Sequence, residues 1–298
     1  MFETPVLFLI FNREDTTQKV FEAIRRQKPK YLFVAADGAR KNKPEEAEKC
    51  RQVRDIIKQV DWDCELKTLF RDKNLGCKLA VSSAITWFFE QVEQGIILED
   101  DCLPDPSFFP FCEELLEKYK DDTRIGHIGG NNFLTGITDE KYSYDFCSFP
   151  HIWGWASWRR VWKNYDLNFC FWDDRKNRRS SLFRNKREEI YFSSFISDVI
   201  NNRHGINTWD TQYWFMLRVQ NQLSVYPAVN LVTNIGLGNP NATHISKKKA
   251  KHSVPASAIA FPLKHPQYVL SNKKIDDLTI KKLFFSWKRL ARYFLRQY

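Results

Sequence analysis

An apolar strand that runs directly into three acids constrains this chain more than any other feature. Residues 96–98 are apolar, and Glu99, Asp100 and Asp101 follow them without a break. Adjacent carboxylates repel one another unless solvent or a cation screens them, and Mg²⁺ and Mn²⁺ prefer oxygen ligands of this kind. Because open α/β sheets bind ligands at the carboxyl ends of their strands, we expect a binding site here. A solvated acidic turn is the alternative interpretation.

The first part of the chain alternates between apolar runs and helical patterns. The apolar runs cover residues 5–11, 31–36, 64–70 and 96–98. A helical pattern follows each run, beginning near Asp15 and then covering residues 44–60, 75–92 and 106–119. This order is typical of a mostly parallel sheet covered by helices on both faces. The sequence therefore predicts an α/β fold with a nucleotide-binding half.

The alternation ends at about residue 130. An aromatic segment at 149–158 is followed by further helical patterns and short strands, at residues 188–203, 208–219, 224–226 and 229–232. The chain shows no internal repeat, and its 298 residues fit one large α/β domain or two closely packed subdomains.

The excess positive charge is confined to the C-terminal part of the chain. The net charge is +10, but residues 241–298 hold 13 Lys and Arg against 2 acids, so the rest of the chain sums to −1. A balanced body offers no basic surface for a phosphate backbone. We therefore expect no nucleic-acid partner.

The cysteines and the apolar segments indicate the compartment. The 7 cysteines are scattered without metal-type spacing, which suits reduced thiols. The N-terminus does not resemble a signal peptide, and no stretch approaches the ~18 apolar residues that a membrane span requires. We expect a cytoplasmic protein, in which the sequon at Asn241 is incidental.

Polar residues follow three of the predicted strands at equivalent places. Asn12 and Arg13 come after the first strand, Asp37 after the second, and the acidic triplet after the fourth. In a parallel sheet these side chains converge along one edge, which would hold a nucleotide. Arg13 offers a planar fork for phosphate or a base edge, and a carboxylate such as Asp37 can accept hydrogen bonds from ribose. Alone, Asp37-Gly38 would be an ordinary turn.

In this order the motifs resemble the GT-A nucleotide-sugar glycosyltransferases. The resemblance covers about residues 5–245 and is greatest to the inverting N-acetylglucosaminyltransferases of Golgi N-glycan branching and their bacterial relatives. The residues that carry it are Asn12-Arg13, Asp37, Glu99-Asp100-Asp101, Phe149-Pro150, Gly154-Trp155 and Trp209-Asp210.

The resemblance implies a role for each donor-side residue. Asp101 would hold a divalent metal, Mn²⁺ or Mg²⁺, and His244 would be a second metal or diphosphate ligand; a solvated loop histidine is the alternative. Glu99 and Asp100 would contact ribose and the donor sugar. Nucleotide contacts would come from Arg13, with the adjacent Asn12, and from Asp37. Ser82 stands where the family has a histidine, which leaves that nucleotide contact in doubt.

The resemblance also implies a catalytic base and an acceptor site. Asp210, in the Trp209-Asp210 pair, corresponds to the family's base, and the alternative is a helix N-cap. Trp153, Gly154 and Trp155 would meet the acceptor together with Trp209, since aromatic faces stack on sugars and a glycine allows close approach. Burial in the core is the alternative for these aromatic residues.

These assignments divide the chain into three parts. Residues 1–130 would form the nucleotide-sugar-binding half, residues 131–245 the acceptor-binding and catalytic half, and residues 246–298 a basic tail. Within the tail, residues 276–298 read as a basic amphipathic helix with aromatic residues on its apolar face. Such a helix is attracted to anionic membranes, which would place the protein at the inner face of the plasma membrane. Docking on the body of the protein is the alternative.

The sequence therefore predicts a metal-dependent inverting glycosyltransferase. It would move a sugar from a nucleotide-sugar, with a UDP-sugar as the expected donor, to a hydroxyl of a glycan or lipid-linked glycan in the synthesis of a bacterial surface polysaccharide. A sugar nucleotidyltransferase is the first alternative, although it would need a glycine-rich loop after the first strand, where residues 11–15 contain no glycine. A non-catalytic scaffold held at a membrane is the second alternative.

Overall fold

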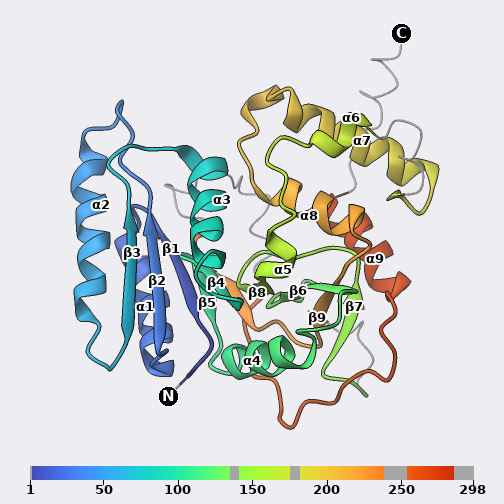
Figure 1. Cartoon of the computed structure of the whole chain (residues 1–298), viewed down its shortest axis with the longest axis horizontal. Coiled ribbons are helices and arrows are strands. Elements are labelled where there is room, and N and C mark those ends of the chain that lie inside the picture. The colour runs from blue at the N-terminus through green and yellow to red at the C-terminus, as the bar shows by residue number, and fades with distance from the viewer. Residues whose placement is uncertain (1, 135–140, 175–181, 238–253, 285–298) are drawn as a thin grey trace.

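An eight-stranded sheet runs through the protein, and its first four strands are parallel. The computed structural model describes residues 2–134, 141–174, 182–237 and 254–284 (Figure 1). The parallel strands lie in the order β3 (Glu65–Phe70), β2 (Tyr31–Ala36), β1 (Val6–Ile10) and β4 (Gln94–Glu99). They match the four predicted apolar runs. The expected α/β fold with a large, mostly parallel sheet flanked by helices is confirmed.

The second part of the chain extends the same sheet. β8 (Trp155–Trp158) lies antiparallel between β4 and β6 (Ile125–Gly129), followed by β9 (Leu223–Pro227) and the edge strand β7 (Tyr144–Cys147). A small second sheet pairs β5 (Cys102–Pro104) with β10 (Val232–Asn234). The predicted strand at 229–232 is therefore displaced towards 234. Strands from both expected halves lie in this one sheet.

Helices cover the parallel strands on both faces. α1 (Glu14–Gln27) and α2 (Glu45–Asp55) lie on one face, and α3 (Gly76–Phe89) lies on the other (Figure 1). This follows from right-handed crossovers, since the connection from β3 to β4 runs back across the sheet. α4 (Phe108–Lys118) packs on β4, β6 and β8. A short 3₁₀ helix, Ile56–Gln59, continues α2.

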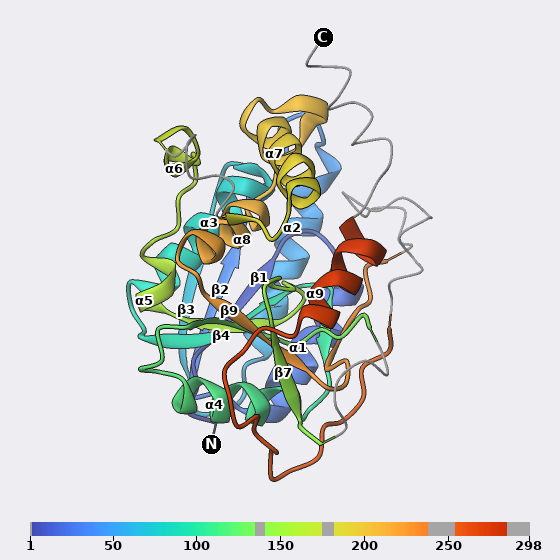
Figure 2. The ribbon, with the colours of Figure 1, turned by 90° about the vertical axis from the view of Figure 1, so that its right-hand side faces the viewer.

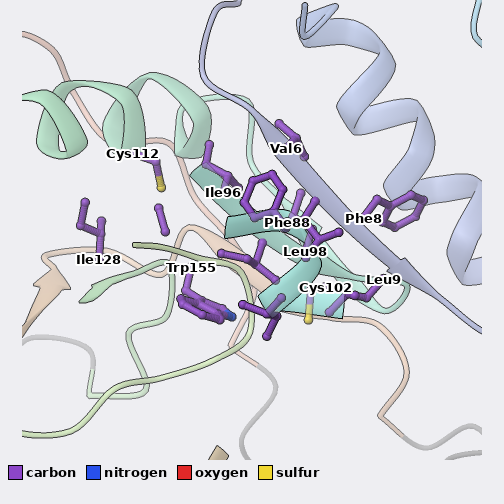
Figure 3. Packing of buried hydrophobic residues seen from close by; sticks show 14 of the residues in the cluster. Val6, Phe8, Leu9, Phe88, Ile96, Leu98, Cys102, Cys112, Ile128 and Trp155 are labelled. Atoms are coloured by element: carbon purple, nitrogen blue, oxygen red, sulfur yellow. The ribbon is translucent and has the colours of Figure 1, made fainter. Parts of the chain in front are cut away.

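The main hydrophobic core lies around the central strands. Every residue of β1 is buried, as expected for a strand covered on both faces. Figure 3 shows Val6, Phe8, Ile96 and Leu98 on neighbouring strands, with Trp155 of β8 in the same core. This core fixes the carboxyl ends of β1, β2 and β4, where the predicted site residues begin.

A second, aromatic core lies under the helices of the later part of the chain. Phe149, Phe192 and Trp214 stack within it. The helices in this region are α5 (Arg159–Trp162), α6 (Cys170–Asp174), α7 (Lys186–Ile200), the 3₁₀ helix Arg203–Gly205 and α8 (Asp210–Val219). The helical patterns predicted at 188–203 and 208–219 correspond to α7 and α8.

The described part of the tail packs on the body. α9 (Lys273–Thr279) lies beside β7 and continues into a π-helical stretch, Ile280–Phe284 (Figure 2). Ile275 and Asp276 are buried, and the Asp276 carboxylate accepts hydrogen bonds from the backbone N–H and hydroxyl of Ser148, both at 2.8 Å. The start of the predicted membrane helix therefore docks on the protein. Residues 285–298 lie outside the described residues.

No helix within the described ranges has the length and apolar character needed to cross a membrane.

Candidate functional site

The carboxyl ends of β1 and β4 bring Arg13 onto the acidic triplet. The two strands are adjacent and parallel, with Leu9 opposite Glu99. The Arg13 guanidinium bridges two carboxylates: Nη2 donates to Asp100, and Nη1 donates to Asp101 Oδ2 at 2.8 Å. Burial by itself would lower the pKa of Arg13, but the two carboxylates outweigh it and hold that pKa far above its usual value. The cation that the triplet requires is, in this structure, the chain's own arginine.

The three acids differ in how they are compensated. Burial raises the pKa of Asp100 to about 6, against the opposing charge of Arg13. Burial, followed by the charges of Asp101 and Asp100, raises the pKa of Glu99 to about 8. Among the described residues, none donates a hydrogen bond to the Glu99 carboxylate. Glu99 is thus the acid of the triplet with the least compensation.

Asp210 lies within electrostatic range of Glu99 although it comes from the other half of the sequence. It is the first residue of α8, and its charge contributes to the raised pKa of Glu99 and to that of Cys77, a residue at the start of α3. A carboxylate in the first turn of a helix is stabilised by the helix dipole. The structure therefore brings together the predicted donor acids and the predicted base, and the chemical roles of these residues stay predictions.

Asp37, which follows β2, binds the backbone at the start of α3. Its carboxylate accepts hydrogen bonds from the backbone N–H of Leu75 at 2.9 Å, of Gly76 at 3.0 Å and of Gly38 at 3.0 Å, and from the Asn74 side chain at 2.9 Å. These include donors at the start of α3 that have no partner within the helix. Both oxygens are engaged, so a nucleotide contact through Asp37, which stays a prediction, would have to share them.

Asn12 belongs to a separate polar network. Its side-chain amide donates to Glu46 Oε1 of α2 at 2.9 Å, and the same carboxylate pairs with Arg40. Glu46 is almost completely buried. Sequence reasoning placed Asn12 in the nucleotide site but gave no signal for Glu46, since the two residues are distant in the chain. This network holds the loop after β2 against α2.

Most of the predicted acceptor residues are buried. Trp155 and Trp209 are 0% and 2% exposed, and their rings stack on each other with centroids 5.8 Å apart. Gly154 is also buried; its φ of +71° and a distance of 2.8 Å from an added Cβ to Val232 explain the glycine. The sequence prediction that these three residues contact an acceptor does not fit this placement, because core packing covers them.

Trp153 is the predicted acceptor residue that remains partly exposed. Its ring meets Phe133 edge to face with centroids 5.0 Å apart, and its backbone N–H donates to Asn131 at 3.0 Å. Trp153 is therefore available for a ligand on one side while being held on the other. Whether it meets an acceptor stays a prediction.

Gly236 is a site residue that sequence reasoning did not assign. A Cβ at this position would lie 2.5 Å from Asp101 Oδ2 and 2.7 Å from Arg13 Nη1. The preceding Ile235 donates its backbone N–H to the Asp101 carbonyl at 2.8 Å. The segment after β10 thus lies directly against the Arg13–Asp101 pair. In the sequence, the glycines and proline of residues 236–240 indicate a loop, but they do not indicate which residues the loop contacts. His244 lies outside the described residues.

A divalent cation fits these residues only together with further ligands. Within the described ranges, no group of three or more His, Cys, Asp or Glu side chains could hold a metal ion. Asp101 Oδ2 faces Arg13, and Oδ1 lies 3.4 Å from the Cys102 thiol. Mg²⁺ in particular is commonly bound by one or two carboxylates plus substrate phosphates. Asp101 fits a cation that arrives with a diphosphate.

No protein-family model matches the chain, and no curated protein matches it significantly. Among solved structures, it is similar to a cytidylyltransferase from Leptospira borgpetersenii, with 10% identity, a TM-score of 0.36, and coverage of 74% of this chain and 94% of that one. HddC from Yersinia pseudotuberculosis has 10% identity and a TM-score of 0.34, covering 58% and 85%. A 4-diphosphocytidyl-2C-methyl-D-erythritol synthase from Anaerococcus prevotii has 10% identity and a TM-score of 0.33, covering 65% and 84%.

Proposed function

We propose that the chain is an inverting glycosyltransferase that takes a sugar from a nucleotide-sugar, with UDP-sugars as the expected donors. The observation that carries the proposal is that the charge of Asp210, at the start of α8, acts on Glu99 at the end of β4. One half of the chain supplies acids and an arginine suited to a donor, and the other half supplies a carboxylate suited to a base. Their meeting at the carboxyl edge of the sheet is where an α/β fold binds its ligand.

Asp210 would act as the general base. A sugar hydroxyl is too weakly acidic to attack an anomeric carbon unaided, so a carboxylate takes its proton as the new bond forms. The acceptor oxygen bonds to the anomeric carbon while the bond from that carbon to the diphosphate breaks. The nucleoside diphosphate leaves with the electron pair, and a single displacement inverts the anomeric configuration.

Arg13 and Asp101 would serve the leaving group. A planar guanidinium binds phosphate oxygens in a bidentate manner, and Arg13 lies at the carboxyl end of β1, where the diphosphate would lie. A divalent cation held by Asp101, either Mn²⁺ or Mg²⁺, would supply positive charge to the departing diphosphate.

The proposed activity is tested by UDP release from a panel of UDP-sugars, with and without Mn²⁺. The expected result is release that depends on one donor sugar, together with a product whose anomeric configuration is opposite to that of the donor. Absence of release from every donor, with and without an added glycan acceptor, would overturn the glycosyltransferase and leave the nucleotidyltransferase and the non-catalytic scaffold.

A sugar nucleotidyltransferase is the second candidate function. One of the similar solved structures is named as a cytidylyltransferase, but its TM-score of 0.36 is too low for that name to bear on this chain. The connection from β1 to α1 contains no glycine to cradle a triphosphate. Release of pyrophosphate from CTP or UTP in the presence of a sugar 1-phosphate would establish this candidate, and release of UDP from a UDP-sugar would establish the first.

The acceptor and the location complete the proposal. The acceptor would be a hydroxyl of a glycan or of a lipid-linked glycan in bacterial surface polysaccharide synthesis. The basic residues of 276–298 would hold the protein on the anionic inner face of the plasma membrane, on the cytoplasmic side. No nucleic acid is expected to take part.

A further inference from the structure

Two of the four residues that end at Asp210, Asn207 and Trp209, are held by other parts of the protein. Asn207 accepts a hydrogen bond from the backbone N–H of Lys78, in the first turn of α3, at 2.9 Å. The Tyr165 hydroxyl donates to the Trp209 carbonyl at 3.1 Å, and the Trp209 ring lies in the core. The chain therefore enters α8 along a fixed path, and α3, which borders the donor acids, is one of its supports.

The carboxylate of Asp210 is held at one oxygen. The Thr208 hydroxyl donates to Asp210 Oδ1, and the Thr211 hydroxyl lies 3.3 Å from the same oxygen. Among the described residues, no hydrogen bond reaches Oδ2. A carboxylate turns easily about its terminal bond, since a torsion between sp³ and sp² carbons is broad. Thr208 thus fixes which oxygen is engaged and leaves the other available.

We infer that Thr208 is a positioning residue for Asp210, which aims Oδ2 at the acceptor hydroxyl while its own hydroxyl restrains Oδ1. This inference rests on the proposed role of Asp210 as the base. Tyr165 and Asn207 support it by fixing the backbone on either side of Thr208. Tyr165 is itself rigid, because its ring stacks on Trp162 with centroids 4.3 Å apart. Proton transfer needs the two heavy atoms within hydrogen-bond reach, so orientation enters the rate directly.

Thr208→Val is the informative substitution, because it keeps the shape of the side chain and removes the hydroxyl. The expected result is a fall in kcat of ~10- to 100-fold with unchanged donor KM and unchanged UDP affinity, since misplacement of a reacting group costs rate rather than binding. Thr208→Ser retains the hydroxyl and should restore kcat. Thr279→Val is a matched control, because the Thr279 hydroxyl is buried without a hydrogen-bond partner and should leave kcat unchanged.

A double-mutant cycle with Asp210→Asn separates positioning from packing. If Thr208 acts through the Asp210 carboxylate, Thr208→Val should cause little further loss in the Asp210→Asn background, so the two effects should not add. Full additivity, or a wild-type kcat in Thr208→Val, would overturn the inference while leaving the proposed glycosyltransferase activity intact. Failure of Thr208→Ser to restore kcat would also overturn it and assign Thr208 to packing.

A failure of the proposed function can be distinguished from a failure of the inference about Thr208. If the wild-type protein transfers no sugar from any donor, both the function and this inference fall, whatever the variants do. Circular dichroism and thermal unfolding of each variant establish that it is folded, and the Thr208→Ser comparison does not depend on the stability of Thr208→Val.

Discussion

Arg13 Nη1 lies 2.8 Å from Asp101 Oδ2, so the residue expected to bind a metal already has a cation as its partner. The same guanidinium binds Asp100, and the backbone of Gly236 packs against both members of the Arg13–Asp101 pair. A divalent ion bound by Asp101 would therefore compete with Arg13 for this carboxylate. A diphosphate would shift this balance, because it offers the guanidinium another anionic partner and offers the cation further oxygen ligands.

We expect Mn²⁺ to bind the wild-type protein weakly without UDP and much more tightly with it. Arg13→Gln should tighten binding of Mn²⁺ alone, since the carboxylates lose their internal partner, and should weaken binding of UDP. Electron paramagnetic resonance of free Mn²⁺ measures Mn²⁺ binding with and without UDP, and a UDP titration measures UDP binding. Arg25→Gln is the control, because Arg25 pairs with Asp61 on the surface. Tight binding of Mn²⁺ without UDP in the wild type, unchanged in Arg13→Gln, would contradict the competition.

Asp101→Asn should abolish the effect of Mn²⁺ on the melting temperature in the presence of UDP. The amide keeps the size of the side chain and removes the charge that attracts a divalent ion. It also leaves Arg13 with one carboxylate fewer, so differential scanning fluorimetry should be run with and without Mn²⁺ for each protein. A Mn²⁺-dependent shift as large as that of the wild type would exclude Asp101 as the ligand.

Asp210→Asn should lower turnover by ~10²–10⁴-fold, as is typical when a general base is lost. Donor affinity should change little, since Asp210 is not expected to contact the nucleotide. Steady-state kinetics and UDP titration give the two quantities separately. Near-normal turnover, or a loss of UDP binding as severe as in Asp101→Asn, would make Asp210 a structural helix-start residue.

The described part of the tail, which ends at Phe284, can be tested separately from the residues that follow it. A chain ending at Phe284 keeps α9 and should retain its melting temperature and turnover, while losing the proposed sedimentation with vesicles that contain phosphatidylserine. A chain ending at Asn272 removes buried Asp276 and leaves the Ser148 backbone N–H without this acceptor, at a cost of ~1–3 kcal/mol for an unsatisfied buried group. Thermal unfolding should show a lower midpoint. Equal melting temperatures for the two truncated chains would contradict the docking of α9.

Local sequence patterns predicted the parallel strands and the acids at their ends. The pairing of β8 and the partner of Arg13 depend on contacts between distant parts of the chain, which local patterns do not show. Strands β1, β2 and β4 are short apolar runs buried in the sheet, so their sequence is sufficient. β8 was not predicted, because its pairing of Trp155 with Ile97 depends on a partner far along the chain and its aromatic residues suit either a core or a ligand. Arg13 is a second example. Its position after the first strand predicts an anionic partner, and only the fold shows that this partner is the acidic triplet of the same chain.

Two buried histidines should make the protein less stable in mild acid. Burial lowers the pKa of His127 to about 3 and that of His151 to about 4. The His127 ring stacks on Trp155, contacts Tyr213 and faces the His151 carbonyl at 3.2 Å. Below about pH 6.5 the unfolded chain binds protons at these positions while the folded chain does not, so stability falls as the pH falls towards 4 and is unaffected above 6.5.

The expected loss is about 2 kcal/mol per histidine at pH 5, since each pH unit between the two pKa values costs about 1.4 kcal/mol. Urea unfolding at pH 7.5, 6 and 5 measures it. His127→Gln removes one titrating group and should reduce the change in unfolding free energy between pH 7.5 and 5 by about that amount, whatever its effect at pH 7.5. His265→Gln is the comparison, because His265 is partly exposed and pairs with Glu114, so its effect should be smaller. An identical pH dependence in the wild type and His127→Gln would mean that His127 can become protonated within the folded protein.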